Sequence, residues 1–583
     1  MTHGENVLGR ERLRRLRTGV ALLTVGLLVL AACGTDAEEP GDLDDPVEDT
    51  DEDVDAADIG DDPPEDEGLG DPQPGGELTF ATEVEADCLD PQQTTAAASR
   101  RVLGQLFDNL VVQADDGTFQ PWLATDWEIS DDGTVYTFEL RDDVTFHDGT
   151  PMNAEAVKFT LDRAVDPATR SPRSAQLLSL YESSEVIDEY TVEVMLQEPF
   201  APLLSALTTE FLAILSPDAY QESVDDVDYC NQATGSGPFV LIERQEGSHV
   251  LMERNDDYAW GPPTADNQDA PYIDRLNVQF VPEDSVREGL LQSGEAQVVE
   301  GLAPDEAAAL ADQDEFRILS ATQPGASYHI VMNESREPWD QEDMRRAFFQ
   351  ALNVDGMVEV LYLGFFPRAH TVLTSSTLGH HDGLEGAIEF DPDAANAALD
   401  AAGWELPEGD VFRTKDGERL VASFLMQEGN RERRTDMGVL MQEQLREVGI
   451  DLQLEPVAQS VFLATYQDGD YDVFGHNLVE GDPDALRQLF GTDTISDEES
   501  LGFNAGHFSV PEVDELVEEG FVTADEEARA EIYREVQERV IDRAGALPIY
   551  ESTYILGSRA DDVVGVAFDA SAFPLFYDAW LVQ

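Results

Sequence analysis

The sequence predicts an α/β protein with more than one domain. Strand patterns, such as the alternating segment 77–81 and the apolar run 239–242, are interspersed with segments whose apolar residues recur at helical spacing. In the second half, strands and connecting helices follow one another regularly, which favours α/β domains. The chain has 583 residues, of which 42% are hydrophobic, so it is long enough for two or more domains with large cores.

The first half contains a clear hairpin and a capped helix. Tyr136, Phe138 and Leu140 recur at a spacing of two, and Asp131–Gly133 supplies the turn before them. Asn153 precedes an apolar-periodic segment and is expected to cap a helix that runs to about residue 163.

The second half predicts alternating helices and strands. Asp340 is expected to cap a helix that carries Met344 and Phe348 on one face, and Asp391 is expected to start another helix with a proline after it. The remaining elements expected here are strands at 420–426, 450–457 and 471–475, a helix at 435–448, and a long helix lined by Ile532, Val536 and Val540.

The N-terminus indicates export and a lipid anchor. Several arginines precede the apolar run 20–32, which is too short to span a bilayer as a mature helix. Leu30-Ala31-Ala32-Cys33 closes this run and resembles a bacterial lipobox. Residues 1–33 are therefore predicted to be a lipoprotein signal peptide, with Cys33 as the lipidated residue. The alternative is an ordinary secretory signal with a chance cysteine.

Residues 34–75 are predicted to form an acidic, disordered tether. Between 36 and 75 there is no Lys or Arg and there are few bulky apolar residues, so the segment cannot offset its ordering entropy by burial. Like charges keep such a chain extended. Next to a lipidated cysteine, the tether would hold a folded body away from the membrane.

The charge excludes nucleic acid as a partner. The formal net charge is −88, from 122 acidic and 34 basic residues, whereas phosphate binding needs a basic face. Only Lys158 and Lys415 are lysines. This composition suggests a highly hydrated surface in a saline medium, where salt screens the self-repulsion. The alternative is a merely acidic surface with an acidic tail.

The remaining chemistry is sparse. Cys88 and Cys230 are the only cysteines besides Cys33, and an even pair in an exported chain is a disulfide candidate. No Gly-rich phosphate loop, nucleophile elbow or paired-histidine zinc motif occurs in the sequence. We therefore expect that the protein is not an enzyme and that it carries no cofactor or resident metal.

Several motifs, in a fixed order, carry a resemblance to a known family. The longest runs from Asp126 through Gly133 to Arg141 and continues at Phe146–Pro151. The others are Leu89–Gln92, Glu198–Pro202, Gly235–Phe239, Met252–Asn255, Arg345–Asn353, Ala401–Trp404, Asp482–Asp484 and Leu547–Ile549. Together they closely resemble the bacterial extracellular solute-binding proteins of family 5, the oligopeptide-, dipeptide- and nickel-binding components of ABC importers.

The resemblance implies a two-lobe clam of the large type, with an extra subdomain in lobe I. Lobe I would comprise 76–325 and the return segment 548–583, and lobe II would comprise 326–547, with hinge crossings near Gly325 and Pro548. The lobes would close over a small ligand, most simply a peptide, and deliver it to a permease and ATPase complex. The binding protein itself would be a monomer. The Cys88–Cys230 pair would lie within lobe I.

The expected cleft residues follow the ends of predicted strands, where ligands meet α/β domains. Tyr328 is added because it adjoins a hinge crossing. For a peptide, Arg431 is expected to pair with a carboxylate, and Glu480 or Asp482 with the ammonium. The full set is Glu83, Glu85, Tyr328, Arg431, His476, Asn477, Glu480 and Asp482.

Two departures from the family pattern leave alternatives open. Val479 stands where many peptide-binding relatives have the aspartate that pairs with the ligand ammonium, and His476 stands in place of a tryptophan. Nickel-chelate relatives place a histidine in this region, so binding of a nickel chelate or another non-peptide solute is the alternative. A ligand sensor without a transporter is a further one.

Overall fold

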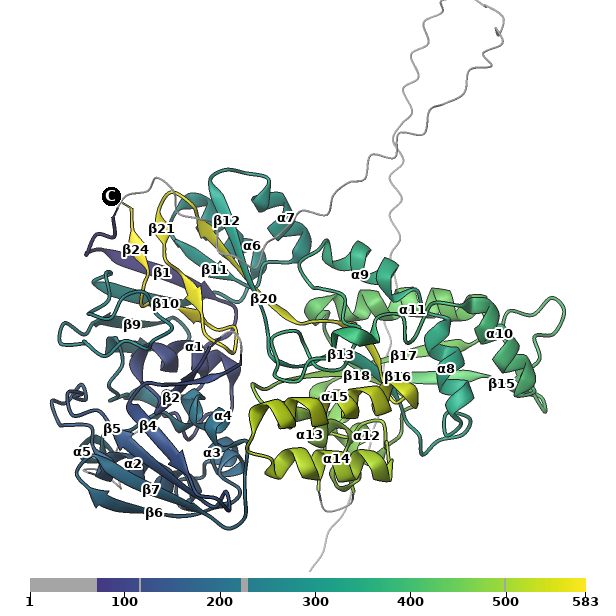
Figure 1. Ribbon diagram of the computed structural model, residues 1–583. Coiled ribbons are helices and arrows are strands. Elements are labelled where there is room, and N and C mark those ends of the chain that lie inside the picture. Colours follow the sequence, from purple (N-terminus) through teal and green to yellow (C-terminus); the bar gives the residue numbers. More distant parts are fainter. Residues whose placement is uncertain (1–70, 115–116, 222–228, 498–499, 583) are drawn as a thin grey trace, which may run out of the picture. The chain divides into compact units, whose positions relative to one another are not determined.

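The computed structural model describes residues 71–114, 117–221, 229–497 and 500–582, all within one unit of the chain. They form two α/β lobes, each built around its own main sheet (Figure 1). Cys33, the signal peptide 1–33 and the tether up to residue 70 lie outside the described residues. Within the described ranges, no helix is long and apolar enough to cross a membrane.

Lobe I is organised by a seven-stranded mixed sheet of order β12-β20-β11-β1-β10-β9-β8. Its central strand β1 pairs in parallel with β10 on one side and β11 on the other. Strand β20, one of the yellow strands in Figure 1, comes from late in the chain and inserts between β12 and β11. The bounds are β1 (Glu77–Thr82), β8 (Phe239–Gln245), β9 (His249–Arg254), β10 (Arg275–Phe280), β11 (Val298–Glu300), β12 (Phe316–Thr322) and β20 (Thr553–Arg559).

An antiparallel four-stranded sheet forms the extra subdomain of lobe I. Its order is β4-β5-β7-β6, with β4 (Ala124–Ile129), β5 (Val135–Leu140), β6 (Tyr181–Asp188) and β7 (Thr191–Leu196). The inward face of β5 is the one predicted, because Tyr136, Phe138 and Leu140 are all buried. Asn153 caps α2 (Ala154–Val165) by accepting a hydrogen bond from the Ala156 amide, also as predicted.

Lobe II contains a five-stranded sheet of order β17-β16-β18-β13-β19. Successive residues of its inner strands enter different cores: Ile330 and Val473 pack on one face, Val331 and Phe474 on the other. Both faces are therefore covered, which explains the continuous apolar runs in the sequence. The bounds are β13 (Gly325–Met332), β16 (Val421–Gln427), β17 (Asp451–Val457), β18 (Val473–Val479) and β19 (Leu547–Tyr550).

Helices cover the two faces of the lobe II sheet. The core on one face includes residues of α8 (Glu342–Gln350), α10 (Pro392–Ala401) and α11 (Arg434–Glu447). The other includes α13 (Ala485–Phe490), α14 (Pro511–Val522) and α15 (Glu526–Asp542). Asp391 caps α10 as predicted. The expected cap at Asp340 is wrong, because α8 starts later and its cap position is Gln341, whose side chain makes no cap hydrogen bond.

The chain crosses between the two main sheets at two adjacent points. The first crossing, between β12 and β13, and the second, between β19 and β20, are joined by a hydrogen bond of 2.8 Å from the Gln323 amide to the Ser552 carbonyl. Gly325 starts β13 with φ +107°, and a Cβ there would lie 2.1 Å from the Leu478 carbonyl oxygen, so only glycine fits.

The second crossing lies slightly later than the sequence predicts. Pro548 was expected to begin the return to lobe I, but it belongs to β19 and stands opposite His329 in the lobe II sheet. All four residues of β19 are buried. The apolar run 547–550 therefore completes the edge of lobe II, and the return falls at Glu551–Ser552.

Lobe I also contains a disulfide. Cys88, in the loop after β1, is joined to Cys230 in the short helical turn before β8, with 4.2 Å between the two Cα atoms. These are the two cysteines that the sequence singles out as a pair. A hydrogen bond from the Leu89 amide to the Cys230 carbonyl (3.0 Å) ties the same two segments together.

Candidate functional site

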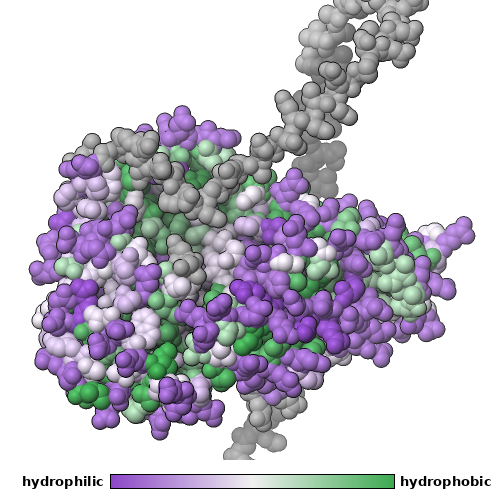
Figure 2. All heavy atoms as spheres, viewed as in Figure 1, coloured by the Kyte–Doolittle hydropathy of each residue, from purple (hydrophilic) through white to green (hydrophobic). Residues whose placement is uncertain are grey.

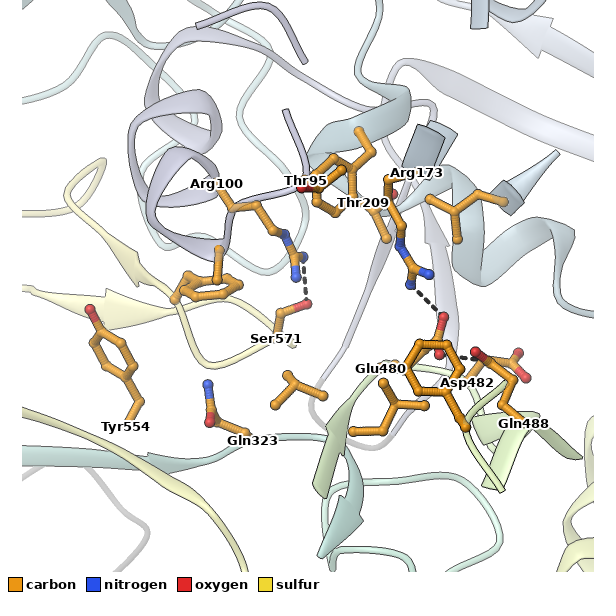
Figure 3. Close-up of a pocket in the computed structure, with 18 of the residues that line it drawn as sticks. Thr95, Arg100, Arg173, Thr209, Gln323, Glu480, Asp482, Gln488, Tyr554 and Ser571 are labelled. Atoms are coloured by element: carbon orange, nitrogen blue, oxygen red, sulfur yellow. Dashed lines mark hydrogen bonds and ion pairs between the residues drawn. The ribbon is translucent and has the colours of Figure 1, made fainter. Parts of the chain in front are cut away.

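A cleft of about 1220 Å³ is lined by residues of both lobes. From lobe I come Arg100 on α1 (Ala97–Leu106), Tyr554 on β20, and Ser571. From lobe II come Glu480, just after β18, and Gln488 on α13. Figure 3 shows these side chains facing the same hollow. The walls of this cleft therefore come from both lobes.

Four of the eight predicted cleft residues line this cleft: Glu83, Arg431, Glu480 and Asp482. Glu83 follows β1 directly and is exposed. Glu480 and Asp482 follow β18. Their placement agrees with the argument that ligands meet α/β domains at the carboxyl ends of strands.

Arg431 is the most accessible cation of the cleft, with 74% of its side chain exposed. Its nearest carboxylate, Glu432, is 3.0 Å away and also binds Arg434 at 2.7 Å and the Tyr550 hydroxyl at 2.6 Å. Burial alone would raise the pKa of Glu432, but the two arginines and Tyr550 lower it to about 2. One carboxylate thus faces two guanidinium groups, which leaves this turn with a positive charge for an anion.

Glu480 forms an ion pair that bridges the two lobes. Arg173, on α3 (Pro172–Leu177) of the lobe I subdomain, donates to Glu480 at 2.6 Å, and Gln488 donates to the other carboxylate oxygen at 2.8 Å (Figure 3). A second bridge joins Arg433 to Asp305 on α7 (Pro304–Ala311) at 2.5 Å.

Asp482 is already neutralised. It is 6% exposed, and Arg529 on α15 binds both of its carboxylate oxygens at 2.6 and 2.8 Å. Its Oδ1 also accepts a hydrogen bond from the Asp484 amide. With these contacts in place Asp482 shapes the wall of the cleft, and Glu480 is the more accessible of the two predicted ammonium partners.

Two predicted residues lie elsewhere. Glu85 turns away from the cleft and accepts a hydrogen bond from the Gly247 amide at 2.8 Å, in the β8–β9 turn. Tyr328 is 2% exposed and stacks on Tyr550 with 4.9 Å between ring centroids. It adjoins a crossing as expected, but β13 is an inner strand whose eight residues are all buried.

His476 and Asn477 also do not line the cleft. Both lie inside β18, which runs to Val479 instead of ending at 475. His476 pairs across the sheet with His329, with 4.7 Å between ring centroids. Burial, then His329 and Arg434, lower the pKa of His476 far below its usual value, so the ring is neutral. Asn477 accepts from Arg434 and donates to Ser552 at the second crossing.

Within the described residues, no three His, Cys, Asp or Glu side chains form a group that could hold a metal ion.

Sequence reasoning missed several charged residues of the cleft. These are mainly arginines on lobe I helices and acids after β18: Arg100, Arg101, Arg173, Glu300, Asp484, Arg487 and Asp493. The adjacent arginines Arg100 and Arg101 give no specific signal, because the sequence also contains Arg345-Arg346 near a helix start, and that pair does not line the cleft.

A comparison with protein families decides the assignment. The model for bacterial extracellular solute-binding proteins, family 5 (middle part), matches residues 118–497, which is more than half of the chain. The chain belongs to this family. The match covers the subdomain and most of lobe II of this solute-binding protein.

Similar proteins span nearly the whole described body. The nickel-binding periplasmic protein of Escherichia coli K12 is 26% identical over 83% of this chain and 91% of its own length. The dipeptide-binding protein of the same strain is 26% identical over 82% and 89%. The crystal structure of NikA from Brucella suis with Fe(III)-EDTA superposes with a TM-score of 0.77 at 26% identity, covering 87% of this chain and 100% of that one.

Proposed function

We propose that this solute-binding protein is the substrate-binding component of an ABC importer and that its ligand is a peptide. It captures the ligand between lobes I and II outside the cytoplasm and passes it to the permease and ATPase complex, without catalysis of its own. The family match supports the transport role, and the similarity to the dipeptide-binding protein supports the ligand class.

The observation that carries the peptide assignment is the size and charge of the cleft. Its volume of about 1220 Å³ exceeds the range of about 300–1000 Å³ usual for small-molecule pockets. It offers an accessible cation, Arg431, and a partly accessible carboxylate, Glu480. A zwitterionic peptide has one group for each. Glu83 and Asp482 complete the predicted residues that line the walls.

The hinge is proposed to lie at the two crossings. Gln323 and Ser552 hold them together by one backbone hydrogen bond, while the ion pairs Arg173–Glu480 and Arg433–Asp305 join the lobes elsewhere. Bending at two short adjacent segments lets each lobe move as a rigid body.

Replacing the predicted end-group partners should weaken peptide binding. Arg431→Ala should raise the Kd for a pool of short peptides about tenfold or more, because a charge-assisted hydrogen bond contributes roughly 1.5–3 kcal/mol. Glu480→Gln should also weaken binding, because it removes the carboxylate that pairs with the ammonium group of the peptide. Calorimetry on the ligand-free protein measures both. Arg446→Ala, an exposed arginine outside the cleft, is the matched control and should change nothing.

Unchanged affinity in both cleft variants would contradict the end-group assignment. Tight binding only in the presence of nickel would instead support the nickel-chelate alternative, which the similarity to the nickel-binding periplasmic protein favours. Mass spectrometry of small molecules that co-purify with the mature protein identifies the ligand class directly.

We further propose that Cys33 carries a lipid anchor and that residues 34–75 tether the body to the membrane surface. The support is the short apolar run that ends in Leu30-Ala31-Ala32-Cys33 and the acidic composition that follows. Cys33→Ala should move the protein from the membrane fraction to the soluble extracytoplasmic fraction, measured by fractionation and immunoblotting. Retention on the membrane in the same amount would show that the anchor lies elsewhere.

The protein is also proposed to work as a monomer with a strongly hydrated surface suited to saline surroundings. Hydrophilic residues cover much of the visible face in Figure 2, in keeping with a net charge of −88.

A further inference from the structure

The charges along the cleft do not balance. Eight carboxylates and six guanidinium groups line it. Asp482 and Asp284 are paired with Arg529 and Arg287, which stand behind the lining, so the excess of negative charge lies in the carboxylates that have no partner within the described ranges. The carboxylates are Glu83, Asp284, Glu300, Glu432, Glu480, Asp482, Asp484 and Asp493. The arginines are Arg100, Arg101, Arg173, Arg431, Arg433 and Arg487.

Each of these arginines already has a carboxylate partner. The pairs are Arg100–Glu210, Arg101–Glu300, Arg173–Glu480, Arg431–Glu432, Arg433–Asp305 and Arg487–Asp484, at 2.5 to 3.0 Å. Arg431 alone among them is mostly exposed, since the other five side chains are at most 32% exposed. The cleft therefore has one good anchor for an anionic group.

Two carboxylates of the cleft differ from these arginines, because their side chains have no partner among the described residues. Across the described part of the chain, the side chains of Glu83 and Asp493 make no hydrogen bond or ion pair. Both are exposed. A cation of the ligand can approach either one without breaking an existing ion pair.

Glu83 belongs to an acidic group on lobe I. Burial alone would lower the pKa of Arg101, but its interactions with the Glu300 carboxylate, the Tyr554 hydroxyl and the Glu83 carboxylate raise it above its usual value, so Glu83 lies close enough to act on this guanidinium. Glu300 accepts hydrogen bonds from Arg101 and from the Tyr554 hydroxyl. Two carboxylates thus face one guanidinium, and we call this set the lobe I acidic end.

Lobe II has a second acidic region. The Asp493 carboxylate interacts electrostatically with Arg487, which already forms an ion pair with Asp484. Gln488 donates its amide to Glu480, and its own Oε1 is buried with no hydrogen-bond partner among the described residues. This oxygen can accept only from a donor that the ligand or water brings. Figure 3 shows Tyr554 and Gln488 at opposite sides of the hollow.

We propose that the cleft selects peptides with a net positive charge and that a basic side chain of the ligand lies against the lobe I acidic end, beside Glu83. The inference rests on the peptide assignment proposed above. Arg431 then holds the one carboxylate of the ligand. The charge of −88 on the whole chain acts in the same direction, because it attracts cationic ligands and repels anionic ones.

Calorimetry with three tripeptides that differ only in the central residue, lysine, alanine or glutamate, tests the selection. At pH 8, where Asp484 with its pKa of about 7 is ionised, the lysine peptide should bind at least tenfold more tightly than the glutamate peptide in 50 mM NaCl. The ratio should shrink severalfold in 1 M NaCl, because salt screens the interaction. This salt series uses the unaltered protein.

Glu83→Gln should lower the lysine-to-alanine affinity ratio by about threefold or more. Glu408→Gln, an exposed glutamate that does not line the cleft, is the matched control and should preserve the ratio. Equal binding of the lysine and glutamate peptides, or an equal loss for all three peptides in Glu83→Gln, would overturn the charge selection and leave the peptide assignment standing. Binding of none of the three would overturn both.

Discussion

Arg529→Met should lower the free energy of unfolding by about 3–5 kcal/mol, because it leaves a buried carboxylate without its counter-charge. Arg529 is 4% exposed and binds both oxygens of Asp482, which is 6% exposed, and its Nε donates to the Gly520 carbonyl. Urea unfolding followed by tryptophan fluorescence measures the loss.

Two further variants separate the buried pair from the general loss of an arginine. Arg539→Met changes the same helix, but its ion pair with Glu535 is 40% and 46% exposed, so the expected loss is below about 1 kcal/mol. Adding Asp482→Asn to Arg529→Met should recover much of the stability, since no uncompensated charge remains. Similar losses for Arg529→Met and Arg539→Met would contradict the argument.

Removal of the disulfide should lower the free energy of unfolding by about 2–5 kcal/mol. The bond joins two residues that are 142 positions apart in sequence, and it links the segment after β1 to the segment before β8. Cys88→Ala with Cys230→Ala should therefore lower the urea midpoint of lobe I. Alanine is the replacement because Cys88 is 3% exposed among apolar residues.

Reduction provides the matched control for this variant. Dithiothreitol should destabilise the unaltered protein by about the same amount and should leave the double variant unchanged. An unaltered protein that unfolds at the same urea concentration with and without reductant would show that the bond does not contribute.

Much of the fold could be predicted because local patterns specify it. The hairpin of β4 and β5, the Asn153 cap and the Asp391 cap depend on residues close together in sequence, and all three are present in the structure. The Asp340 cap failed for a local reason too: helix ends are the least certain feature of a periodic pattern.

The candidate site was harder to predict than the fold. Four residues were correctly predicted to line the cleft, because the sequence pattern located the strand or turn that each of them follows. These are Glu83, Arg431, Glu480 and Asp482. His476 and Asn477 were misplaced because the boundary of β18 was four residues too early, 475 instead of 479. Within the longer strand, the His476 ring lies beside His329 of β13, and the Asn477 side chain bonds to Arg434 and Ser552.

The sequence by itself determined the fold class, the family resemblance, the cysteine pair and the acidic character of the chain. Only the tertiary structure decided which charges of the cleft are free. Arg173 and Glu480 are 307 positions apart in sequence, and Arg100 and Ser571 are 471 apart, yet each pair is in contact. A side chain's charge is available to a ligand only if no partner neutralises it, and those partners come from distant segments that folding alone brings together.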